Sequence, residues 1–372
     1  MRVLILVNMD IGLYKFRKEL IEELLQQKNE VYISLPDGEL VRPFEEMGCT
    51  FIDTPVDRRG IDPKTDMKLF MRYRKMMKEV NPDLVITYTI KPNIYGGIAA
   101  RLAKIKYAVN ITGLGTAFEN NDLIRTIVVT LYRFALKKAK VIFFENRANR
   151  DELLSFKVCD KLQTVVLNGA GVNTDIYSYL PYPLDDESSS DRENVRNEGW
   201  VRFLFVGRVM KEKGIDELFE AMKWLIAEGK HCFLDVVGPF EEDYKDKLEQ
   251  YEKDGWLKYH GYQSDVRPFI ENCHCFVLPS YHEGMANTNL ECASSGRPVI
   301  TSNIPGCKEA VIGGVSGLLC EPKNVDSLYS AMKQMVEMGV VERRAMGMAG
   351  RKHMEEVFDK KKVVEETIAR LY

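Results

Sequence analysis

The sequence lacks any apolar run approaching the roughly 18 residues that a membrane-spanning helix requires. It also lacks a basic excess, because 52 lysines and arginines stand against 55 acidic residues and give a net charge of −3. A membrane-spanning protein and a general nucleic-acid binder are therefore not expected. The chain opens directly on the apolar run VLILV, with no charged leader before it, so we expect a cytoplasmic protein.

Arrangements that hold a metal or a disulfide are also scarce. The eight cysteines are scattered along the chain, which favours reduced and mostly buried thiols over a disulfide framework. Cys273, His274 and Cys275 form half of a zinc-like site, but no second ligand pair follows them at a suitable spacing. We therefore predict that the protein uses no metal and no cofactor.

What the sequence does contain is a regular alternation of strand-length apolar runs and amphipathic helical segments. The apolar runs lie at 3–7, 31–35, 84–89, 107–111, 141–144, 203–206, 233–237, 257–259, 275–278, 299–301 and 317–319. This alternation predicts an α/β protein with parallel sheets covered by helices on both faces. The 372 residues exceed the size at which one hydrophobic core usually stops growing, so two domains are expected.

Residues 177–199 interrupt the alternation with two prolines, three consecutive serines and several acidic residues. A segment of this composition cannot bury enough apolar surface to form a core. We therefore predict a Rossmann-like domain over 1–175, a linker or exposed loop over 176–197, a second Rossmann-like domain over 198–350, and a C-terminal helix over 351–372. Ligands of doubly wound sheets bind at the carboxyl ends of the strands, so functional residues should follow strands.

The most informative segment follows the predicted strand 275–278. A loop carrying Glu283 leads to a helix that begins near Asn287, and Glu291 lies in the first turns of that helix. The helix N-terminus would present the backbone amides of Met285, Ala286 and Asn287 to phosphate or sugar oxygens. Two carboxylates beside such a site can accept hydrogen bonds from neighbouring hydroxyls. Each glutamate alone would be interpreted as a surface charge, but the whole arrangement favours a site for a sugar or a phosphate.

A second segment follows the predicted strand 203–206, which ends in Gly207. Arg208 and Lys213 lie in the loop that comes next, before a helix begins. Arginine offers a planar fork to a diphosphate and lysine a point charge, and fixed cations stabilise the charge that a leaving diphosphate gains. An ordinary basic loop is the alternative interpretation of this segment taken alone.

The two segments together resemble glycosyltransferase family 4, the retaining enzymes of the GT-B fold. The resemblance rests on Pro-Ser-x-x-Glu-Gly at 279–284, continued by Glu-x-x-x-x-Gly-x-Pro-Val at 291–299, with Gly-Arg and Lys-Gly upstream. It covers most of the second domain and extends to 168–175 and 363–372. It implies two Rossmann-like doubly wound domains facing across a cleft, with the C-terminal helix returning to the first domain.

The resemblance also implies roles in binding a nucleotide diphosphate sugar donor. Arg208 and Lys213 would hold the donor diphosphate, and Glu283 would bind the donor sugar near its anomeric centre; these three are the predicted catalytic residues. Glu291 would bind the ribose hydroxyls. The amides of 285–287 would contact sugar and phosphate.

Two further donor contacts follow from the same resemblance. The nucleobase would lie near Gly261 and Tyr262, which follow the predicted strand 257–259. Gly12, in the loop at 10–13, would let the backbone of the first domain approach the phosphates. A plain turn between a strand and a helix is the alternative interpretation of Gly12.

The sequence departs from the family at one point. Many members carry a histidine near the reacting centre, in a His-Gly step after a strand of the first domain, whereas no histidine here precedes His231. The corresponding step is Thr112-Gly113, so no histidine role can be carried over, and a donor phosphate oxygen is left as the base. We expect Thr112, Gly113 and Gly115 to shape the acceptor site, with a tight strand-to-helix turn as the alternative.

Residues 123–144 contain five basic residues and no acidic residue, among many apolar ones. A basic helix with an apolar face can lie on an anionic bilayer, so contact with the inner face of the membrane is one hypothesis for this segment. A helix that faces the core and is solvated on its other side is the alternative. The segment at 88–92 and the loop at 113–115 are similar to members of the family that build bacterial surface polysaccharide or lipid-linked oligosaccharide.

The resemblance therefore implies a retaining glycosyltransferase that moves a hexose or N-acetylhexosamine from a UDP-linked donor to a lipid-linked saccharide acceptor in surface polysaccharide biosynthesis. No metal is expected to take part. A nucleotide-sugar epimerase of similar fold is the alternative, since it would bind the same donor without an acceptor. A dehydrogenase is disfavoured because its fingerprint needs three glycines and residues 8–13 supply one. A two-domain solute-binding protein would not need the diphosphate cations.

Overall fold

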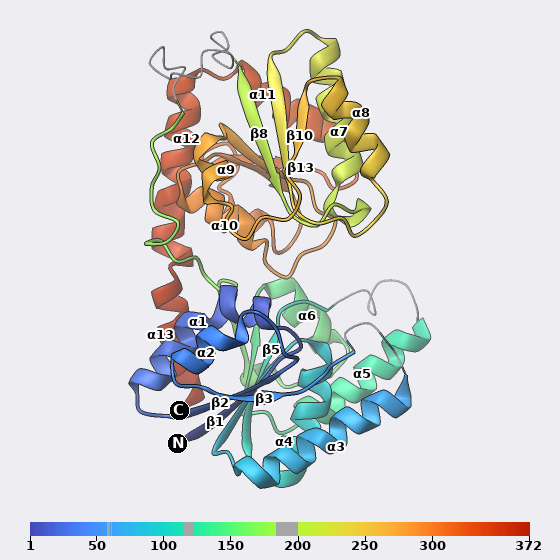
Figure 1. The fold of residues 1–372 in the computed structure, drawn as a ribbon, viewed down its shortest axis with the longest axis vertical. Helices are drawn as coiled ribbons and strands as arrows, with labels where there is room; N and C mark the ends of the chain where they lie inside the picture. The colour runs from blue at the N-terminus through green and yellow to red at the C-terminus, as the bar shows by residue number, and fades with distance from the viewer. Residues whose placement is uncertain (58–59, 61, 115–121, 184–199) are drawn as a thin grey trace. The chain divides into compact units, whose positions relative to one another are not determined.

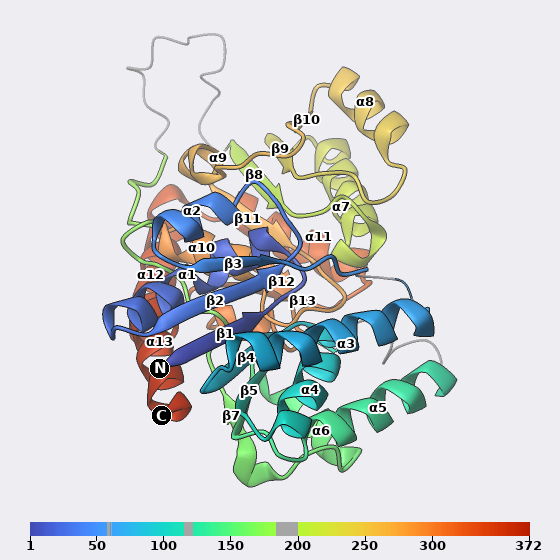
Figure 2. The same cartoon turned by 60° about the horizontal axis from the view of Figure 1, so that its bottom comes forward.

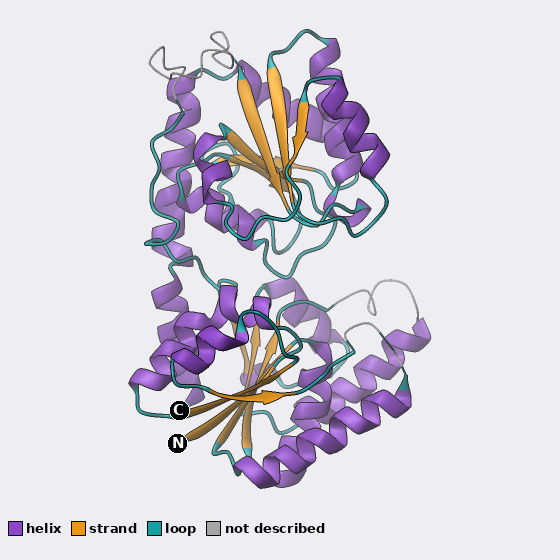
Figure 3. Cartoon of the chain, in the orientation of Figure 1, coloured by secondary structure: helices purple, strands orange, loops and turns teal. Residues whose placement is uncertain are grey.

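The structure is a computed structural model that describes residues 1–57, 60, 62–114, 122–183 and 200–372. The chain forms two compact units, one of Met1–Gly171 with Lys360–Tyr372, and one of Val172–Asp359. Each unit contains one parallel β-sheet with helices packed on its faces (Figures 1 and 3). The predicted α/β class with two Rossmann-like domains is therefore confirmed.

The first unit has a seven-stranded sheet in the order β3-β2-β1-β4-β5-β6-β7. Its strands are β1 Arg2–Leu6, β2 Glu30–Leu35, β3 Thr50–Asp53, β4 Leu84–Tyr88, β5 Lys106–Ile111, β6 Val141–Phe144 and β7 Thr164–Val166. Its helices are α1 Asp10–Gln26, α2 Val41–Glu46, α3 Pro63–Val80, α4 Gly97–Ala103 after a π-helical turn Pro92–Gly96, α5 Asp122–Leu136, α6 Arg147–Ser155 and α13 Lys360–Leu371.

Alternation of side chains along the strands gives this sheet two separate hydrophobic cores. Leu4 and Leu6 of β1 belong to the core that includes residues of α3, α4 and α5. Val3 and Ile5 belong to the core that includes residues of α1, α2 and α13. Figure 2 shows these two groups of helices on opposite sides of the first unit's sheet.

The C-terminal helix α13 is part of the first unit, as predicted. Val363 and Leu371 are buried in the core with α1. Lys360 donates from Nζ to the Phe16 carbonyl at 3.2 Å and lies 3.9 Å from the Glu19 carboxylate. These contacts fix the end of the chain against α1.

The second unit has a six-stranded sheet in the order β10-β9-β8-β11-β12-β13. Its strands are β8 Val201–Val206, β9 Cys232–Val237, β10 Leu257–Tyr259, β11 Cys275–Leu278, β12 Val299–Ser302 and β13 Gly317–Cys320. Its helices are α7 Ile215–Ala227, α8 Lys245–Lys253, α9 Arg267–Asn272, α10 Asn287–Ser294, α11 Val325–Glu337 and α12 Val340–His353, which a π-helical turn Met354–Phe358 extends.

The boundaries of the units differ from the predicted ones at 175 and 350. Residues 172–183 belong to the second unit, since Tyr177 and Leu180 pack on its core and the Tyr182 hydroxyl donates to the His274 carbonyl at 2.9 Å. Residues 351–359 also belong to it, and the rest of the predicted linker lies outside the described residues. Within the described ranges, no helix is both long and apolar enough to span a bilayer.

Candidate functional site

The predicted donor-binding residues of the second unit all follow strands of its sheet. Arg208 and Lys213 come after β8, Gly261 and Tyr262 after β10, and 283–291 after β11. The strands β10, β9, β8 and β11 are successive neighbours and run parallel. Their carboxyl ends therefore meet at one edge of the sheet, which is where doubly wound folds bind ligands.

The loops that follow β8 and β11 are packed tightly together. Gly214 has a φ of +70°, and a Cβ atom there would lie 2.1 Å from the Pro279 carbonyl oxygen, so only glycine fits. The Tyr281 amide donates to the Glu212 carbonyl at 2.9 Å. This close approach places Lys213 directly beside the loop that carries Glu283.

Lys213 and Glu283 form a largely buried ion pair, with side chains 16% and 14% exposed. Lys213 donates to Oε1 of Glu283, and the Ser280 hydroxyl donates to the same oxygen at 2.8 Å. Two donors on Oε1 hold the carboxylate in one orientation. Within the described part of the chain, Oε2 is thus the oxygen that can accept a hydrogen bond from a ligand.

The Cys307 thiol is fully buried and lies within electrostatic range of this pair. Burial raises the pKa of Cys307, and the Glu283 carboxylate raises it further. The thiol therefore stays neutral and packs in the core of the second unit.

Arg208 forms an ion pair of its own, separate from the pair of Lys213 and Glu283. Its Nη1 lies 3.6 Å from Oε2 of Glu241, and its side chain is 46% exposed. Glu241 follows β9, so this pair joins the loops after β8 and β9. A half-exposed guanidinium can exchange this carboxylate for a ligand phosphate at small cost, because exposed ion pairs are weak.

Glu291 lies in α10 and is hydrogen-bonded to the hydroxyl of Tyr177. Burial and the Glu291 charge raise the pKa of Tyr177, so the phenol remains a hydrogen-bond donor. The Tyr177 carbonyl accepts from Ser294 Oγ at 2.7 Å and from Arg351 Nη1 at 2.8 Å. Sequence reasoning missed Tyr177, although it fixes the carboxylate that was predicted to bind ribose.

The backbone amides at 285–287 were predicted to contact sugar and phosphate, but one of them is already hydrogen-bonded within the protein. The Ala286 amide is not available to a ligand, because it donates to the Gly306 carbonyl at 2.8 Å. Gly306 sits so close that a Cβ atom there would lie 2.6 Å from the Glu283 carbonyl oxygen. Met285 is buried in the core, and Asn287 begins the helix. Among the described residues, the buried Oδ1 of Asn287 has no hydrogen-bond partner, which suits a hydroxyl or amide of a ligand.

Gly261 and Tyr262 form an exposed turn at the end of β10. Gly261 has a φ of +64°, and open space lies beside it, since a Cβ atom would meet nothing within 4 Å. The Gly261 carbonyl accepts from the Gly238 amide at 2.8 Å. Tyr262 is 56% exposed, so its ring is accessible to a ligand.

The predicted residues of the first unit lie at the carboxyl edge of that unit's sheet. Gly12 is in the first turn of α1 and not in a loop, because α1 already begins at Asp10. Asp10 accepts from the Ile11 amide at 2.7 Å and from the Leu40 amide at 3.1 Å. Thr112 and Gly113 follow β5 and are half-buried, whereas Gly115 lies outside the described residues.

Sequence reasoning missed a buried ion pair at the same edge of the first unit. Arg17 of α1 donates to Glu145, which follows β6, at 2.6 Å, and both side chains are 10% exposed. The guanidinium lies 5.1 Å from the centre of the Tyr88 ring. The pair thus ties α1 to the ends of β4 and β6.

The apolar stripe of the basic segment 123–144 faces mainly the protein interior. Tyr132 and Leu136 of α5 are fully buried, and 141–144 is strand β6. Two large apolar side chains of this helix are nevertheless exposed, Ile127 by 51% and Phe134 by 48%. The basic residues predicted to accompany them are Arg125, Arg133, Lys137, Lys138 and Lys140.

Cys273, His274 and Cys275 have a structural role. Both cysteines are fully buried. Burial lowers the pKa of His274 to about 3, and its Nδ1 accepts from the Arg202 amide at 3.0 Å. Over the ranges that the structure describes, no group of three or more His, Cys, Asp or Glu residues is placed to hold a metal ion.

Comparison with known proteins assigns both halves of the chain to glycosyltransferase families. Residues 2–146 match the family model for glycosyl transferase 4-like proteins, and residues 186–353 match the model for glycosyl transferases group 1. The N,N'-diacetylbacillosaminyl-diphospho-undecaprenol alpha-1,3-N-acetylgalactosaminyltransferase of Campylobacter jejuni is 26% identical, over 91% of this chain and 90% of that protein. The capsular polysaccharide biosynthesis glycosyltransferase CapM of Staphylococcus aureus is 24% identical, over 92% of this chain and 90% of that protein.

Solved structures show the same fold. HepE of Anabaena, in complex with UDP and glucose, has a TM-score of 0.80 at 16% identity and covers 100% of this chain and 99% of its own. WaaG, a glycosyltransferase involved in lipopolysaccharide biosynthesis, has a TM-score of 0.71 at 14% identity and covers 98% and 99%. With both halves matched by family models and relatives aligned along nearly the whole chain, the protein belongs to the family 4-like glycosyltransferases of GT-B fold and is a hexosyltransferase.

Proposed function

We propose that the protein is a retaining glycosyltransferase that moves a hexose or N-acetylhexosamine from a UDP-linked donor to a lipid-linked saccharide in surface polysaccharide biosynthesis. Relatives from Campylobacter jejuni and Escherichia coli are named for transfer onto saccharides linked to diphosphoundecaprenol. CapM is named for capsular polysaccharide biosynthesis, and the HepE structure holds UDP and glucose. These names support the donor and acceptor classes that the proposal assigns.

The ion pair of Lys213 and Glu283 at the sheet edge is the observation that carries the proposal. A donor diphosphate would take Lys213 as its partner, while Ser280 keeps Glu283 in place for a hydroxyl of the sugar. Lys213 and Arg208 would then neutralise the charge that grows on the leaving diphosphate, with the N-terminus of α10 adding a partial positive charge. A donor phosphate oxygen would receive the acceptor proton.

Product analysis tests the proposal directly. Incubation with UDP-sugars and a lipid-linked saccharide should give a new glycosidic bond whose anomeric configuration, measured by NMR, matches that of the donor. Inversion would contradict the retaining mechanism. Free epimerised nucleotide sugar without a glycosidic product would favour the epimerase instead.

Replacing Glu291 by alanine should weaken UDP binding by roughly 10- to 100-fold, the loss expected for a hydrogen bond to a charged group. The proposed role of this carboxylate is to accept from the ribose hydroxyls while Tyr177 fixes it. Calorimetry with UDP measures the effect, and Glu249→Ala, on the exposed face of α8, serves as the control. Equal affinity of the Glu291 variant and the wild type would rule out the ribose role.

We also propose that the exposed apolar residues of α5 contact the membrane that carries the acceptor. Ile127 and Phe134 lie seven residues apart, which places them on the same side of a helix, and basic side chains accompany them. Such a surface combines apolar insertion with attraction to anionic headgroups.

The double variant Ile127→Ser/Phe134→Ser should bind anionic vesicles at least about tenfold more weakly, because each buried apolar side chain contributes roughly 1.5–3 kcal/mol. Co-sedimentation with phosphatidylglycerol vesicles measures this. Val341→Ser on α12, where the replaced valine is 81% exposed, is the matched control. If both variants sediment like the wild type, α5 does not contact the membrane.

A further inference from the structure

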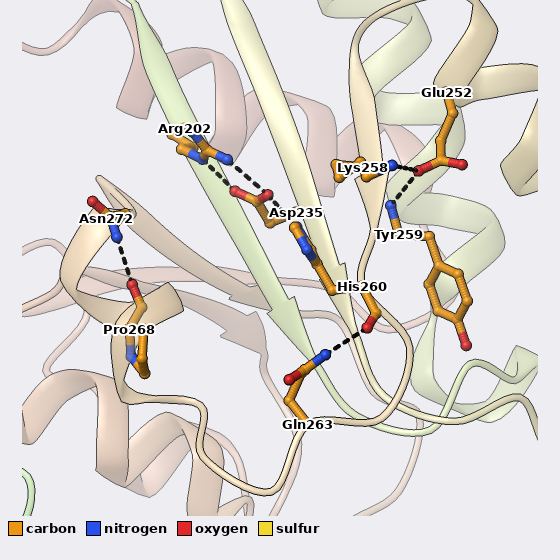
Figure 4. Close-up of polar contacts among 9 residues, drawn as sticks. All are labelled: Arg202, Asp235, Glu252, Lys258, Tyr259, His260, Gln263, Pro268 and Asn272. Carbon is orange, nitrogen blue, oxygen red and sulfur yellow. Dashed lines mark hydrogen bonds and ion pairs between the residues drawn. The ribbon is translucent and has the colours of Figure 1, made fainter. Parts of the chain in front are cut away.

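A buried carboxylate in the second unit holds two side chains from the neighbouring strands. Asp235 lies in β9 and is 3% exposed. Arg202 of β8 donates to both of its oxygens, from Nη2 to Oδ1 at 2.9 Å and from Nε to Oδ2. His260, directly after β10, lies with Nε2 2.7 Å from Oδ1, and Figure 4 shows Asp235 between these two partners.

The carboxylate of Asp235 is ionised in this arrangement. Burial by itself raises its pKa, but the hydrogen bonds from His260 and Arg202 outweigh burial and leave the pKa below its ordinary value. An ionised carboxylate can only accept hydrogen bonds, which assigns the proton of this contact to Nε2 of His260. Buried ion pairs often add little stability compared with apolar packing. The network is therefore better explained by the residues that it holds in position.

The backbone of His260 is fixed together with its ring. Its amide donates to the Val236 carbonyl at 2.9 Å, and its carbonyl accepts from Gln263 Nε2 at 2.8 Å. The next residue, Gly261, turns the chain at a φ of +64° and accepts from the Gly238 amide. The turn that was predicted to meet the nucleobase is therefore anchored through His260 on one side and Gly238 on the other.

The same anchor leads to the loop that carries Arg208. Gly238 packs so closely on the neighbouring loop that a Cβ atom there would lie 1.8 Å from the Gly207 carbonyl oxygen. Two exposed aromatic side chains border this region, Tyr262 by 56% and Phe240 by 39%. Exposed aromatic faces at this edge of the sheet suit a nucleobase, which stacks on aromatic rings.

We propose that His260, held by Asp235, is a positioning residue for the nucleobase of the donor. It fixes the turn of Gly261 and Tyr262 at a set distance from the cation Arg208, so that a base and a diphosphate on the same nucleotide can both be bound. The inference rests on the proposed function, since it assumes that a nucleotide donor occupies this edge of the sheet. A purely structural role of the network would affect all ligands of the site alike.

The test compares UDP with inorganic pyrophosphate, which lacks the base, as competitive inhibitors of sugar transfer. His260→Ala should raise the inhibition constant of UDP about tenfold and that of pyrophosphate less than about twofold, with kcat nearly unchanged, because one hydrogen bond to a charged group is lost only on the base side. His260→Gln should recover most of the UDP affinity, since its amide can donate to Asp235. His231→Ala, an exposed histidine just before β9, is the matched control.

Gln263→Ala provides a second variant in case His260→Ala does not fold. It removes the donor to the His260 carbonyl and leaves Asp235 untouched, so the same selective loss of UDP affinity is expected. Equal weakening of UDP and pyrophosphate, or unchanged UDP affinity, would overturn the positioning role. Failure of the wild type to be inhibited by UDP would instead overturn the proposed nucleotide donor, which is a separate result.

Discussion

Lys213→Ala should lower kcat by roughly 10²- to 10³-fold, the range found when an enzyme loses one preorganised partner for developing charge. Lys213 is only 16% exposed, and Gly214 and Tyr281 hold its loop against the loop of Glu283. Its charge is therefore already in place, in a poorly solvated position, when a diphosphate begins to leave. Initial rates at saturating donor measure the effect.

Two further variants separate this catalytic effect from a loss of structure. Lys211→Ala removes an exposed lysine from the same loop and should leave kcat nearly unchanged. The single variant Lys213→Ala leaves the charge of Glu283 unpaired. The double variant Lys213→Ala/Glu283→Gln removes both charges, so it should be more stable than the single variant while its kcat stays as low. A kcat for Lys213→Ala within about threefold of the wild type would reject the leaving-group role, because a lost electrostatic contact of this kind costs far more.

Central strands were predictable because they are buried on both faces. All five residues of β4 and all four of β11 are buried, so each produces a mainly apolar run in the sequence. The edge strand β3, TFID, is exposed at both ends, and β7, TVV, is only half-buried. Edge strands of this kind leave too weak a pattern to be found without their partners.

The candidate site was predictable where its residues directly follow neighbouring strands of one sheet. Lys213 and Glu283 follow adjacent strands, so their contact follows from the parallel order. Tyr177 reaches Glu291 from a segment that looked like a linker, and its place depends on packing against α10. Helical periodicity likewise could not tell whether the apolar residues of α5 face the core or the solvent, and Tyr132 is fully buried.

Arg297 is a residue whose role the sequence conceals. It stands between Gly296 and Pro298 in the motif segment, where an arginine would ordinarily be taken as exposed. Its side chain is instead fully buried and donates to four carbonyl groups at 2.9 to 3.0 Å. The acceptors are the carbonyls of Ile270, Leu180, Pro181 and Glu271. One guanidinium thus donates hydrogen bonds both to carbonyls at the end of α9 and to carbonyls of the segment at 180–181.

Arg297→Met should lower the free energy of unfolding by roughly 1.5–3 kcal/mol, because it removes the charged donor that these four carbonyls share while keeping much of the side-chain volume. Urea unfolding followed by circular dichroism measures the loss. Arg344→Met, which replaces an exposed arginine of α12, should change stability by less than about 0.5 kcal/mol.

The same substitution should also weaken UDP binding, because the segment that Arg297 anchors continues from Tyr177, the partner of Glu291. Calorimetry below the unfolding transition should therefore show lower UDP affinity for Arg297→Met and wild-type affinity for Arg344→Met. A loss of stability with unchanged affinity would mean that Tyr177 holds Glu291 independently of the 180–181 anchor. The burial of one arginine would then serve folding alone, and the link between this segment and donor binding would be absent.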